Sequence, residues 1–352
     1  MNQLGDNKMI CSEVTNIATE NVTSCPLCGL KECGIMYRGL QDRFWGAPGK
    51  WNLRQCIDCG LLYLDPRPAP EHVSKVYPVE YAYRKVANKI KRTNFLRRIN
   101  QIAIKGFLSN RYGYRKKGSF LQRIFSLPFY LLPAWCKRAG LQVLCLPYKP
   151  DHRLLDVGCG TGEFLERMIH LGWQAEGIDT NPHVIEICKG RGLPAQVGAL
   201  EEQNYPDDRY YAITLRHVLE HVPDPIKLLE ECRRILKPGG RLAVLTPNLN
   251  SIGHRVLKNS WSGLDVPRHM CIFNTRTLYE TAQKSGLRIE DMFSTSRSAG
   301  FNWLVSCRGQ SAYRNKPSLM DAIKSRIFEK MISLILLLNN EAGEELLMIA
   351  TK

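Results

Sequence analysis

The sequence of 352 residues lacks the features that define several common classes of protein. Residues 1–20 contain Asn, Asp, Glu and Thr where a secretory signal has an apolar core, which argues against export by that route. The longest apolar runs, 124–135 and 331–338, fall short of the roughly 20 residues that cross a bilayer. The sequence also has no repeat period or low-complexity tract. We therefore expect a folded, water-soluble, cytoplasmic chain of two or three units.

Acidic residues are missing from one long segment. Residues 84–150 contain 16 Lys or Arg and no Asp or Glu, while the rest of the chain has 33 residues of each sign. The net charge of +16 therefore originates in this segment. Its cations alternate with apolar residues such as Phe95 and Ile99, a pattern typical of an amphipathic helix. Three interpretations stay open: the apolar residues cover a neighbouring domain or an oligomer interface, the segment contacts a membrane, or it binds RNA.

Thirteen cysteines would suggest disulfides in an exported protein, but here metal ligands and buried thiols are the better interpretation. Cys25 and Cys28, and then Cys56 and Cys59, form two Cys-x-x-Cys-Gly turns separated by 27 residues. The glycine after each pair permits a positive φ that turns backbone N–H groups towards the sulfurs, and four thiolates complete a tetrahedral zinc shell. We predict a structural zinc site in a small ribbon. An oxidised pair or four unrelated buried cysteines are the alternatives.

An α/β pattern begins at His152, where short apolar runs alternate with amphipathic ones and predict a parallel sheet covered on both faces. The first strand, 153–157, leads directly into a glycine-rich loop, 158–162, at the start of a helix. No Gly-Lys-Ser/Thr of a phosphate-binding loop is present, and Glu163 stands where a dinucleotide site has its third glycine. Asp179 ends the next strand, where an acid can bind ribose hydroxyls. These features favour a nucleoside cofactor without phosphates.

These segments resemble class I S-adenosylmethionine-dependent methyltransferases. Residues 155–162, Leu-Asp-Val-Gly-Cys-Gly-Thr-Gly, match the cofactor loop of that family. Residues 217–225 match its fourth-strand motif, and residues 236–240 match the turn before its fifth strand. The resemblance implies a Rossmann-like α/β fold with a mostly parallel seven-stranded sheet in the order 3-2-1-4-5-7-6, and S-adenosyl-L-methionine as cofactor. The cofactor-binding residues that it implies are Asp156, Gly158, Gly160, Gly162, Asp179, Ala199, Leu200 and Arg216.

The sheet order of that family reverses between strands 1 and 4, so residues 216–221 would face the cofactor loop and the reactive methyl group. Transfer to a hydroxyl requires a base, and a histidine with a pKa of about 6.5 can accept a proton at neutral pH. The candidates are His221, His269 and Glu220. Alternatively, Glu220 and His221 only hydrogen-bond the helix that begins near Asp224.

A narrower resemblance, carried by residues 51–68 and 261–273, is to zinc-ribbon methyltransferases of bacterial surface-polysaccharide biosynthesis. With this resemblance we divide the chain into a flexible tail (1–20), a zinc ribbon (21–75), a basic helical insert (76–150) and a methyltransferase domain (151–352).

The same resemblance implies that the methyl acceptor is a hydroxyl of a nucleotide- or lipid-linked sugar. From the N-terminus and the basic, apolar pattern we expect the protein in the cytoplasm or peripherally at the inner face of the membrane, with contact through residues 84–150. Transfer to carbon or nitrogen, an RNA-modifying methyltransferase and a catalytically silent cofactor-binding partner are the alternatives.

Overall fold

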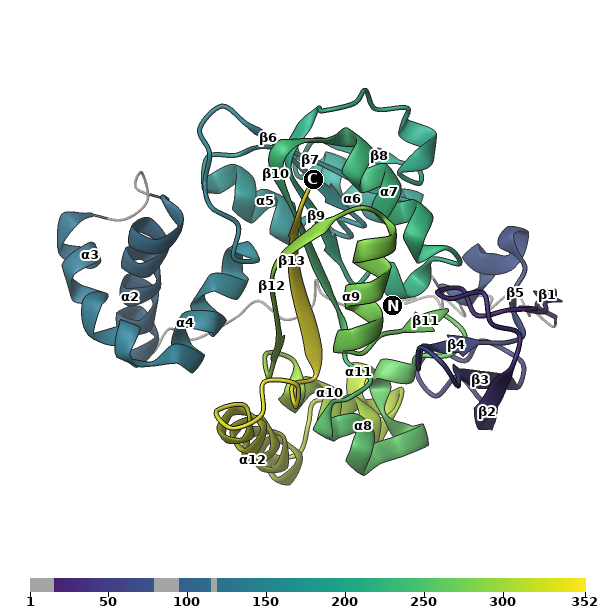
Figure 1. Cartoon of the computed structure of the whole chain (residues 1–352). Helices are drawn as coiled ribbons and strands as arrows, with labels where there is room; N and C mark the ends of the chain where they lie inside the picture. The colour runs from purple at the N-terminus through teal and green to yellow at the C-terminus, as the bar shows by residue number, and fades with distance from the viewer. Residues whose placement is uncertain (1–15, 79–94, 115–118) are drawn as a thin grey trace, which may run out of the picture.

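The computed structural model describes residues 16–78, 95–114 and 119–352. Most of the expected tail and the first part of the basic segment lie outside the described residues. The described residues form three parts (Figure 1): a central sheet with helices on both faces, a set of short N-terminal strands on one side and a helical unit, defined as residues 95–143, on the other.

Seven strands make up the central sheet in the order β12-β13-β10-β9-β6-β7-β8. Numbered along the chain this is 3-2-1-4-5-7-6, the predicted order, with β13 antiparallel to both of its neighbours. The reversal between β6 and β9 opens the carboxyl edge of the sheet to a ligand at that point. The strands are β6 (Arg153–Val157), β7 (Gln174–Asp179), β8 (Ala195–Val197), β9 (Tyr210–Arg216), β10 (Leu236–Pro247), β12 (Arg288–Thr295) and β13 (Glu345–Thr351).

Two hydrophobic clusters cover the two faces of this sheet, because successive strand residues point to opposite sides. On one face α7 (Pro225–Ile235) and α9 (Thr275–Lys284) pack together with the N-terminal cysteines. The other face is covered by α5 (Glu163–His170), α6 (Pro182–Gly190) and part of the helical unit. The central strands are buried on both sides, which explains their nearly continuous apolar runs.

The N-terminal strands form a four-stranded antiparallel sheet in the order β11-β4-β3-β2. Its strand β11 (Cys271–Ile272) comes from the C-terminal half of the chain and pairs with β4. A second contribution from that half is Trp261, which packs with Trp51 in one buried cluster. The ribbon therefore shares both a sheet and a core with residues after β10. Its other strands are β2 (Cys33–Leu40), β3 (Trp51–Cys56) and β4 (Leu62–Leu64), and a short pair, β1 (Thr19–Glu20) with β5 (Arg67–Pro68), lies beside them.

The helical unit consists of α2 (Phe95–Tyr112), α3 (Phe120–Phe125), α4 (Pro133–Gly140) and the 3-10 turns η3 (Leu127–Leu131) and η4 (Leu141–Val143). Helices α2 and α3 approach closely at Gly106, where a Cβ atom would lie 1.9 Å from the carbonyl oxygen of Gln122. Within the described ranges, none of the helices combines the length and the apolar character that a membrane span needs.

Four further helices follow β10. Helices α10 (Ala299–Arg308) and α12 (Leu319–Ile335) pack on each other through Phe328 and Ile332 of α12. The shorter α8 (Ile252–Leu257) and α11 (Ser311–Arg314) lie near them, at the carboxyl edge of the parallel strands (Figure 1).

A buried arginine connects the ribbon to the C-terminal half of the chain. The guanidinium of Arg268 is fully buried and donates two hydrogen bonds of 2.8 Å to Asp42, whose side chain is also fully buried. It also donates to Asp265 at 2.7 Å and to the carbonyl oxygen of Val76 at 3.0 Å. One side chain therefore joins the β2–β3 loop, the end of the ribbon and the 265–270 loop.

Replacing this arginine should destabilise the fold strongly. We expect Arg268→Met to lower the free energy of unfolding by about 3–5 kcal/mol, because two carboxylates would be left buried without their partner. Urea unfolding followed by circular dichroism measures the loss. The control is Arg276→Met, which removes an exposed ion pair with Glu280 and should change the stability little. Equal stability of the two variants would contradict the structural role of Arg268.

Candidate functional site

The glycine loop between β6 and α5 has a left-handed backbone at three positions, with φ of 66° at Gly158, 54° at Gly160 and 77° at Gly162. A Cβ atom would lie 2.3 Å from Val218 Cγ2 at Gly158 and 2.5 Å from Leu193 Cδ1 at Gly162. At Gly160, in contrast, no described atom lies within 4 Å of that position. Two glycines therefore allow tight packing, and the third leaves open space beside the backbone, as a bound nucleoside requires.

The acid at the end of β7 is tied to this loop. Asp179 accepts hydrogen bonds of 2.9 Å from the backbone N–H groups of Gly160 and Asn181. Burial raises the pKa of Asp179 above its ordinary value, while the two N–H donors act in the opposite direction. The structure thus brings Asp179 and the glycine loop together. Gly198 donates its N–H to the Asp179 carbonyl oxygen, which places Ala199 close by. The side chain of Leu200 is buried in the core.

Two other predicted cofactor residues, Asp156 and Arg216, lie on the strands β6 and β9 next to the loop. Asp156, in β6, accepts a hydrogen bond of 2.6 Å from Thr214 of β9. Arg216, at the end of β9, places its guanidinium 4.7 Å from the ring centre of Phe164. Burial lowers the pKa of Arg216, and its Nε has no hydrogen-bond partner among the described residues. A buried donor of this kind suits a polar group of a bound cofactor.

An ionic cluster with two buried carboxylates holds the segment after β9. The carboxylate of Glu220, in the turn η6 (Leu219–His221), bonds His217 Nδ1 at 3.0 Å and accepts from Thr246 Oγ1 at 2.9 Å. The other ring nitrogen of His217 lies 3.0 Å from Glu345. Burial alone would lower the pKa of His217, but the two carboxylates raise it to about 9. Burial would raise the pKa of Glu220, but His217 lowers it to about 2. A charged His217 between two carboxylates therefore fixes this turn.

His221 and His269 lie together, with ring centres 4.7 Å apart. His221 Nδ1 is 3.0 Å from the carbonyl oxygen of Arg268, and His269 Nδ1 is 2.7 Å from that of Gly263. Because a carbonyl oxygen only accepts, we assign the ring proton to Nδ1 in both residues, which leaves a lone pair on each Nε2. Burial lowers the pKa of His221 to about 4, and His269 adds to this decrease. His221 is therefore a neutral imidazole at pH 7.

The three predicted candidates for the base are neighbours in the structure. One carboxylate oxygen of Glu220 and one ring nitrogen each of His221 and His269 all lie within 4.8 Å of one another. Both oxygens of Glu220 are already engaged by His217 and Thr246. Within this cluster, the two imidazoles thus carry the lone pairs that can accept a proton from an acceptor.

Three residues of this site escaped the sequence analysis. Tyr77, which follows the ribbon, has its hydroxyl 2.9 Å from His221 Nδ1. Thr246 and Glu345 hold the cluster around His217. Glu345 could have been noticed as a charged residue that opens an otherwise apolar strand. For Tyr77 and Thr246 the sequence contains no comparable signal.

The four predicted cysteine ligands converge in the ribbon. Sγ of Cys25 lies 3.6 Å from that of Cys59, Sγ of Cys28 lies 3.4 Å from that of Cys56, and the four sulfurs all lie within 4.8 Å of one another. Four thiolates at about 2.3 Å from one ion would be about 3.8 Å apart. The four thiols are free, which argues against the oxidised pair. The spacing of the sulfurs therefore fits a tetrahedral zinc ion.

Comparison with known proteins agrees with this geometry. Residues 127–291 match a family model described as a methyltransferase domain, which begins within the helical unit. A ubiquinone biosynthesis O-methyltransferase of Xanthomonas oryzae pv. oryzae (strain PXO99A) is 38% identical over 103 residues, which are 27% of this chain and 43% of that protein. The protein of the same name from Xylella fastidiosa (strain 9a5c) is 40% identical over 106 residues, 27% of this chain and 42% of that protein. The chain thus spans less than half the length of these relatives.

Solved structures with a similar arrangement include an S-adenosylmethionine-dependent methyltransferase from Mesorhizobium loti, 17% identical with a TM-score of 0.44 over 61% of this chain and 97% of that one. A methyltransferase of the same kind from Archaeoglobus fulgidus is 20% identical with a TM-score of 0.41, over 70% of this chain and 98% of that one. Residues 127–291 are therefore similar to a methyltransferase domain, and the strand order and the glycine loop are those that the resemblance to class I S-adenosylmethionine-dependent methyltransferases predicts.

Proposed function

We propose that this protein transfers a methyl group from S-adenosylmethionine to a hydroxyl of a nucleotide- or lipid-linked sugar. The observation that carries the proposal is the pair of imidazoles, His221 and His269, each held with a lone pair on Nε2. Val218, in the same segment as His221, packs against Gly158, so the imidazole pair and the cofactor loop belong to one site.

The cofactor would be held by the residues already grouped around the loop. The backbone at Gly160 offers open space, Asp179 would bind the ribose hydroxyls, and the buried Nε of Arg216 offers a donor. When bound, S-adenosylmethionine supplies a methyl group that is already activated as part of a sulfonium. The protein therefore has to position the acceptor and take up its proton.

On the acceptor side, His221 or His269 takes up the hydroxyl proton at Nε2. The hydroxyl of Tyr77 and the backbone carbonyl oxygen of Arg268 fix the orientation of His221, and the charged cluster around His217 fixes the turn that carries it. Tyr77 is thus a positioning residue, because it acts through His221.

Two observations support a sugar hydroxyl as acceptor. The curated relatives bear names that describe O-methyltransferases, which favours oxygen over carbon or nitrogen. The ribbon resembles those of bacterial surface-polysaccharide enzymes, and the groups around the imidazole pair, Tyr77 and Asp265, are polar, as recognition of a sugar requires.

We also infer that a structural zinc ion occupies the four-cysteine site. Four thiolates leave no coordination position for water or substrate, so the ion would stabilise the ribbon. The ribbon carries Asp42 and leads to Tyr77, and both residues reach the acceptor side through Arg268 and His221. Zinc would therefore support the site from a distance.

Gly160→Ala tests the cofactor site, with Gly192→Ala as a matched control. Both glycines have positive φ, and no described atom lies within 4 Å of either Cβ position, so each substitution should cost about 1–2 kcal/mol of stability. Only the methyl group at position 160 would occupy the space beside the loop. We expect the Kd for S-adenosylmethionine, measured by calorimetry, to rise by about 10-fold or more in Gly160→Ala alone. Equal affinities would contradict the assignment of this space to the cofactor.

His221→Ala and His269→Ala test the proton acceptor. With methyl-labelled cofactor and fractionated cell-envelope precursors, loss of the base should lower the rate of labelling by about 100-fold or more while the affinity for S-adenosylmethionine stays the same. His183→Ala, an exposed histidine on α6, serves as the control. Wild-type rates in both variants would remove the catalytic assignment. Cofactor binding without labelling of any fraction would favour the catalytically silent alternative.

The pH dependence of the wild-type rate is a second test of His221 as the base. Because the pKa of His221 is lowered to about 4, its imidazole stays neutral from pH 7 down to about pH 5 and is protonated as the pH falls through 4. If His221 is the base, the wild-type rate should therefore stay level over this range and should not fall near 6.5, the ordinary value for histidine. A loss of activity centred near pH 6.5 would contradict that role.

Cys25→Ser tests the zinc site. The wild-type protein should contain one zinc ion per chain by mass spectrometry, and Cys25→Ser should lose it together with several degrees of thermal stability. Cys33 lies in the same ribbon, outside the four-cysteine cluster, so Cys33→Ser should keep its zinc. A wild-type protein without zinc, or the same loss in both variants, would exclude this site.

A further inference from the structure

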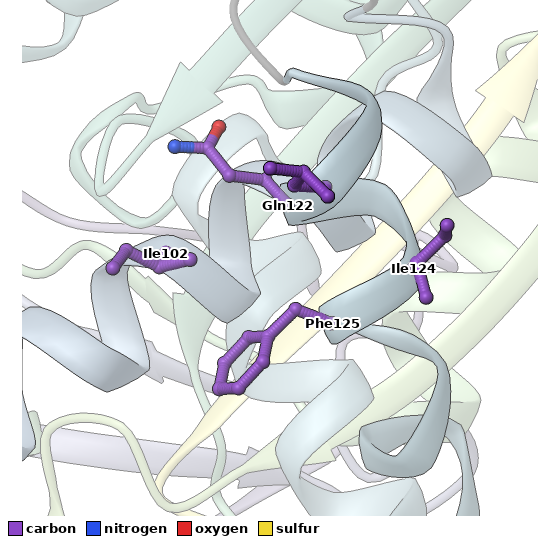
Figure 2. Close-up of a pocket in the computed structure, with 5 residues that line it drawn as sticks. Ile102, Gln122, Ile124 and Phe125 are labelled. Atoms are coloured by element: carbon purple, nitrogen blue, oxygen red, sulfur yellow. The ribbon is translucent and has the colours of Figure 1, made fainter.

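The helical unit exposes large apolar side chains at its outer end. Leu131 is 84% exposed and Leu121 is 76% exposed. Figure 2 shows the groove between α2 and α3, a pocket of about 410 Å³ lined by apolar side chains and Gln122. We define the helical tip as residues 120–132. Its exposed apolar residues are Phe120, Leu121, Ile124, Phe125, Leu127, Tyr130, Leu131 and Leu132.

A second apolar surface runs along α12. While Phe328 and Ile332 face α10 and are buried, the residues on the outer face are exposed. They are three or four positions apart, which places them on one face of a helix and its following turn. This α12 stripe consists of Leu319, Ile323, Ile327, Met331, Leu334 and Leu338.

The two apolar surfaces belong to neighbouring parts of the fold. Arg138, in α4, forms an ion pair of 2.9 Å with Glu329 of α12. Lys137 donates a hydrogen bond of 3.3 Å to Asn340, just beyond α12. In Figure 1, α12 lies at the bottom of the molecule, on the side of the central sheet that carries the helical unit.

Cations accompany both surfaces. The helical unit has no acidic residue in its sequence, and the exposed cations on α2 are Arg98, Lys105 and Arg111. On α12 the two acids are both paired, Asp321 with Arg308 at 3.6 Å and Glu329 with Arg138. The exposed cations of α12 are Lys324, Arg326 and Lys330.

We propose that the helical tip and the α12 stripe dock this protein on the surface of an anionic phospholipid bilayer. Such a surface accepts apolar side chains at the depth of the headgroups and attracts the cations beside them. A second copy of the chain would bring two surfaces of the same charge together. RNA would neutralise the cations but leave the exposed leucines and isoleucines in water.

This docking would place the acceptor side of the site near the bilayer. Helix α12 packs on α10, and Ser306 and Asn302 of α10 hydrogen-bond Ser262. The neighbouring residue, Gly263, accepts the hydrogen bond of His269. If the proposed methyl transfer is correct, a lipid-linked sugar would reach the imidazole pair from the same surface. This last step rests on the proposed function, whereas the docking itself does not.

Vesicle flotation of the full-length protein tests the docking. We expect flotation with vesicles of phosphatidylcholine and phosphatidylglycerol, weaker flotation with phosphatidylcholine alone, and loss of binding as salt screens the charges. The triple variant Lys324→Gln, Arg326→Gln, Lys330→Gln should partition about 100-fold more weakly, since each cation near the surface contributes about 1 kcal/mol.

Variants that replace exposed apolar residues by serine test whether the apolar side chains of the two surfaces contribute to membrane binding in addition to the charges. Leu121→Ser with Leu131→Ser, and Ile327→Ser with Leu334→Ser, should each reduce flotation. Ile57→Ser should not, although Ile57 is 70% exposed, because it lies in the ribbon on the other side of the molecule (Figure 1). Circular dichroism and affinity for S-adenosylmethionine verify that every variant is folded and keep this test independent of methyl transfer.

Three results would overturn the proposal. The first is no flotation of the wild-type protein with anionic vesicles. The second is self-association that the apolar variants abolish while flotation is unchanged, which would assign the surfaces to a second copy. The third is RNA binding that the charge variant abolishes while flotation is unchanged.

Discussion

The arrangement of the proposed acceptor side, around His221 and His269, depends on the buried guanidinium of Arg268. Its bonds to Asp42 and Asp265 bring together two loops that are more than 200 residues apart in sequence. Its bond to the Val76 carbonyl oxygen fixes the chain next to Tyr77, and its own carbonyl oxygen orients His221. A charge so deeply buried is tolerated only with its partners in place, so the loops and the imidazoles are held as one unit.

A second charged group, the partly exposed His217 between two buried carboxylates, connects this unit to the central sheet. His217 directly follows β9, its partner Glu345 begins β13, and Thr246, which bonds Glu220, lies in β10. Three neighbouring strands thus meet at one ionic cluster at the carboxyl edge of the sheet. His217 and His221 differ in protonation at pH 7. The two carboxylates raise the pKa of His217, so it is charged, whereas burial lowers the pKa of His221, so it is neutral. The neutral histidine keeps a lone pair, as the proposed role of a base requires.

Much of this could be predicted from the sequence where the signal was local. The glycine loop, Asp179 and the two Cys-x-x-Cys turns are short motifs whose geometry depends on neighbouring residues, and the structure brings each group together. The sheet order followed from the family resemblance and is the one observed. Glu220 and His221 are neighbours in the sequence, but it is the structure that brings His269, from a loop after β10, next to them.

The rest depends on contacts between distant parts of the chain. Strand β11 has only two residues, too few for any periodicity, and exists because β4 offers it an open edge. Tyr77 reaches His221 through the path of the chain after the ribbon, which no local pattern encodes. The exposed face of α12 has helical spacing, but the sequence alone could not tell whether another element covers it.

The pairing of β4 with β11 has a consequence for how the protein is made. On the ribosome, β2, β3 and β4 emerge about 200 residues before β11. The edge of β4 therefore stays unpaired, and about half of the residues of the shared apolar core are missing, while most of the central sheet is synthesised. The N-terminal segment is therefore not an independent module added to an enzyme. It reaches its final form only when the second half of the chain is available, and the two halves mature as a single cooperative body.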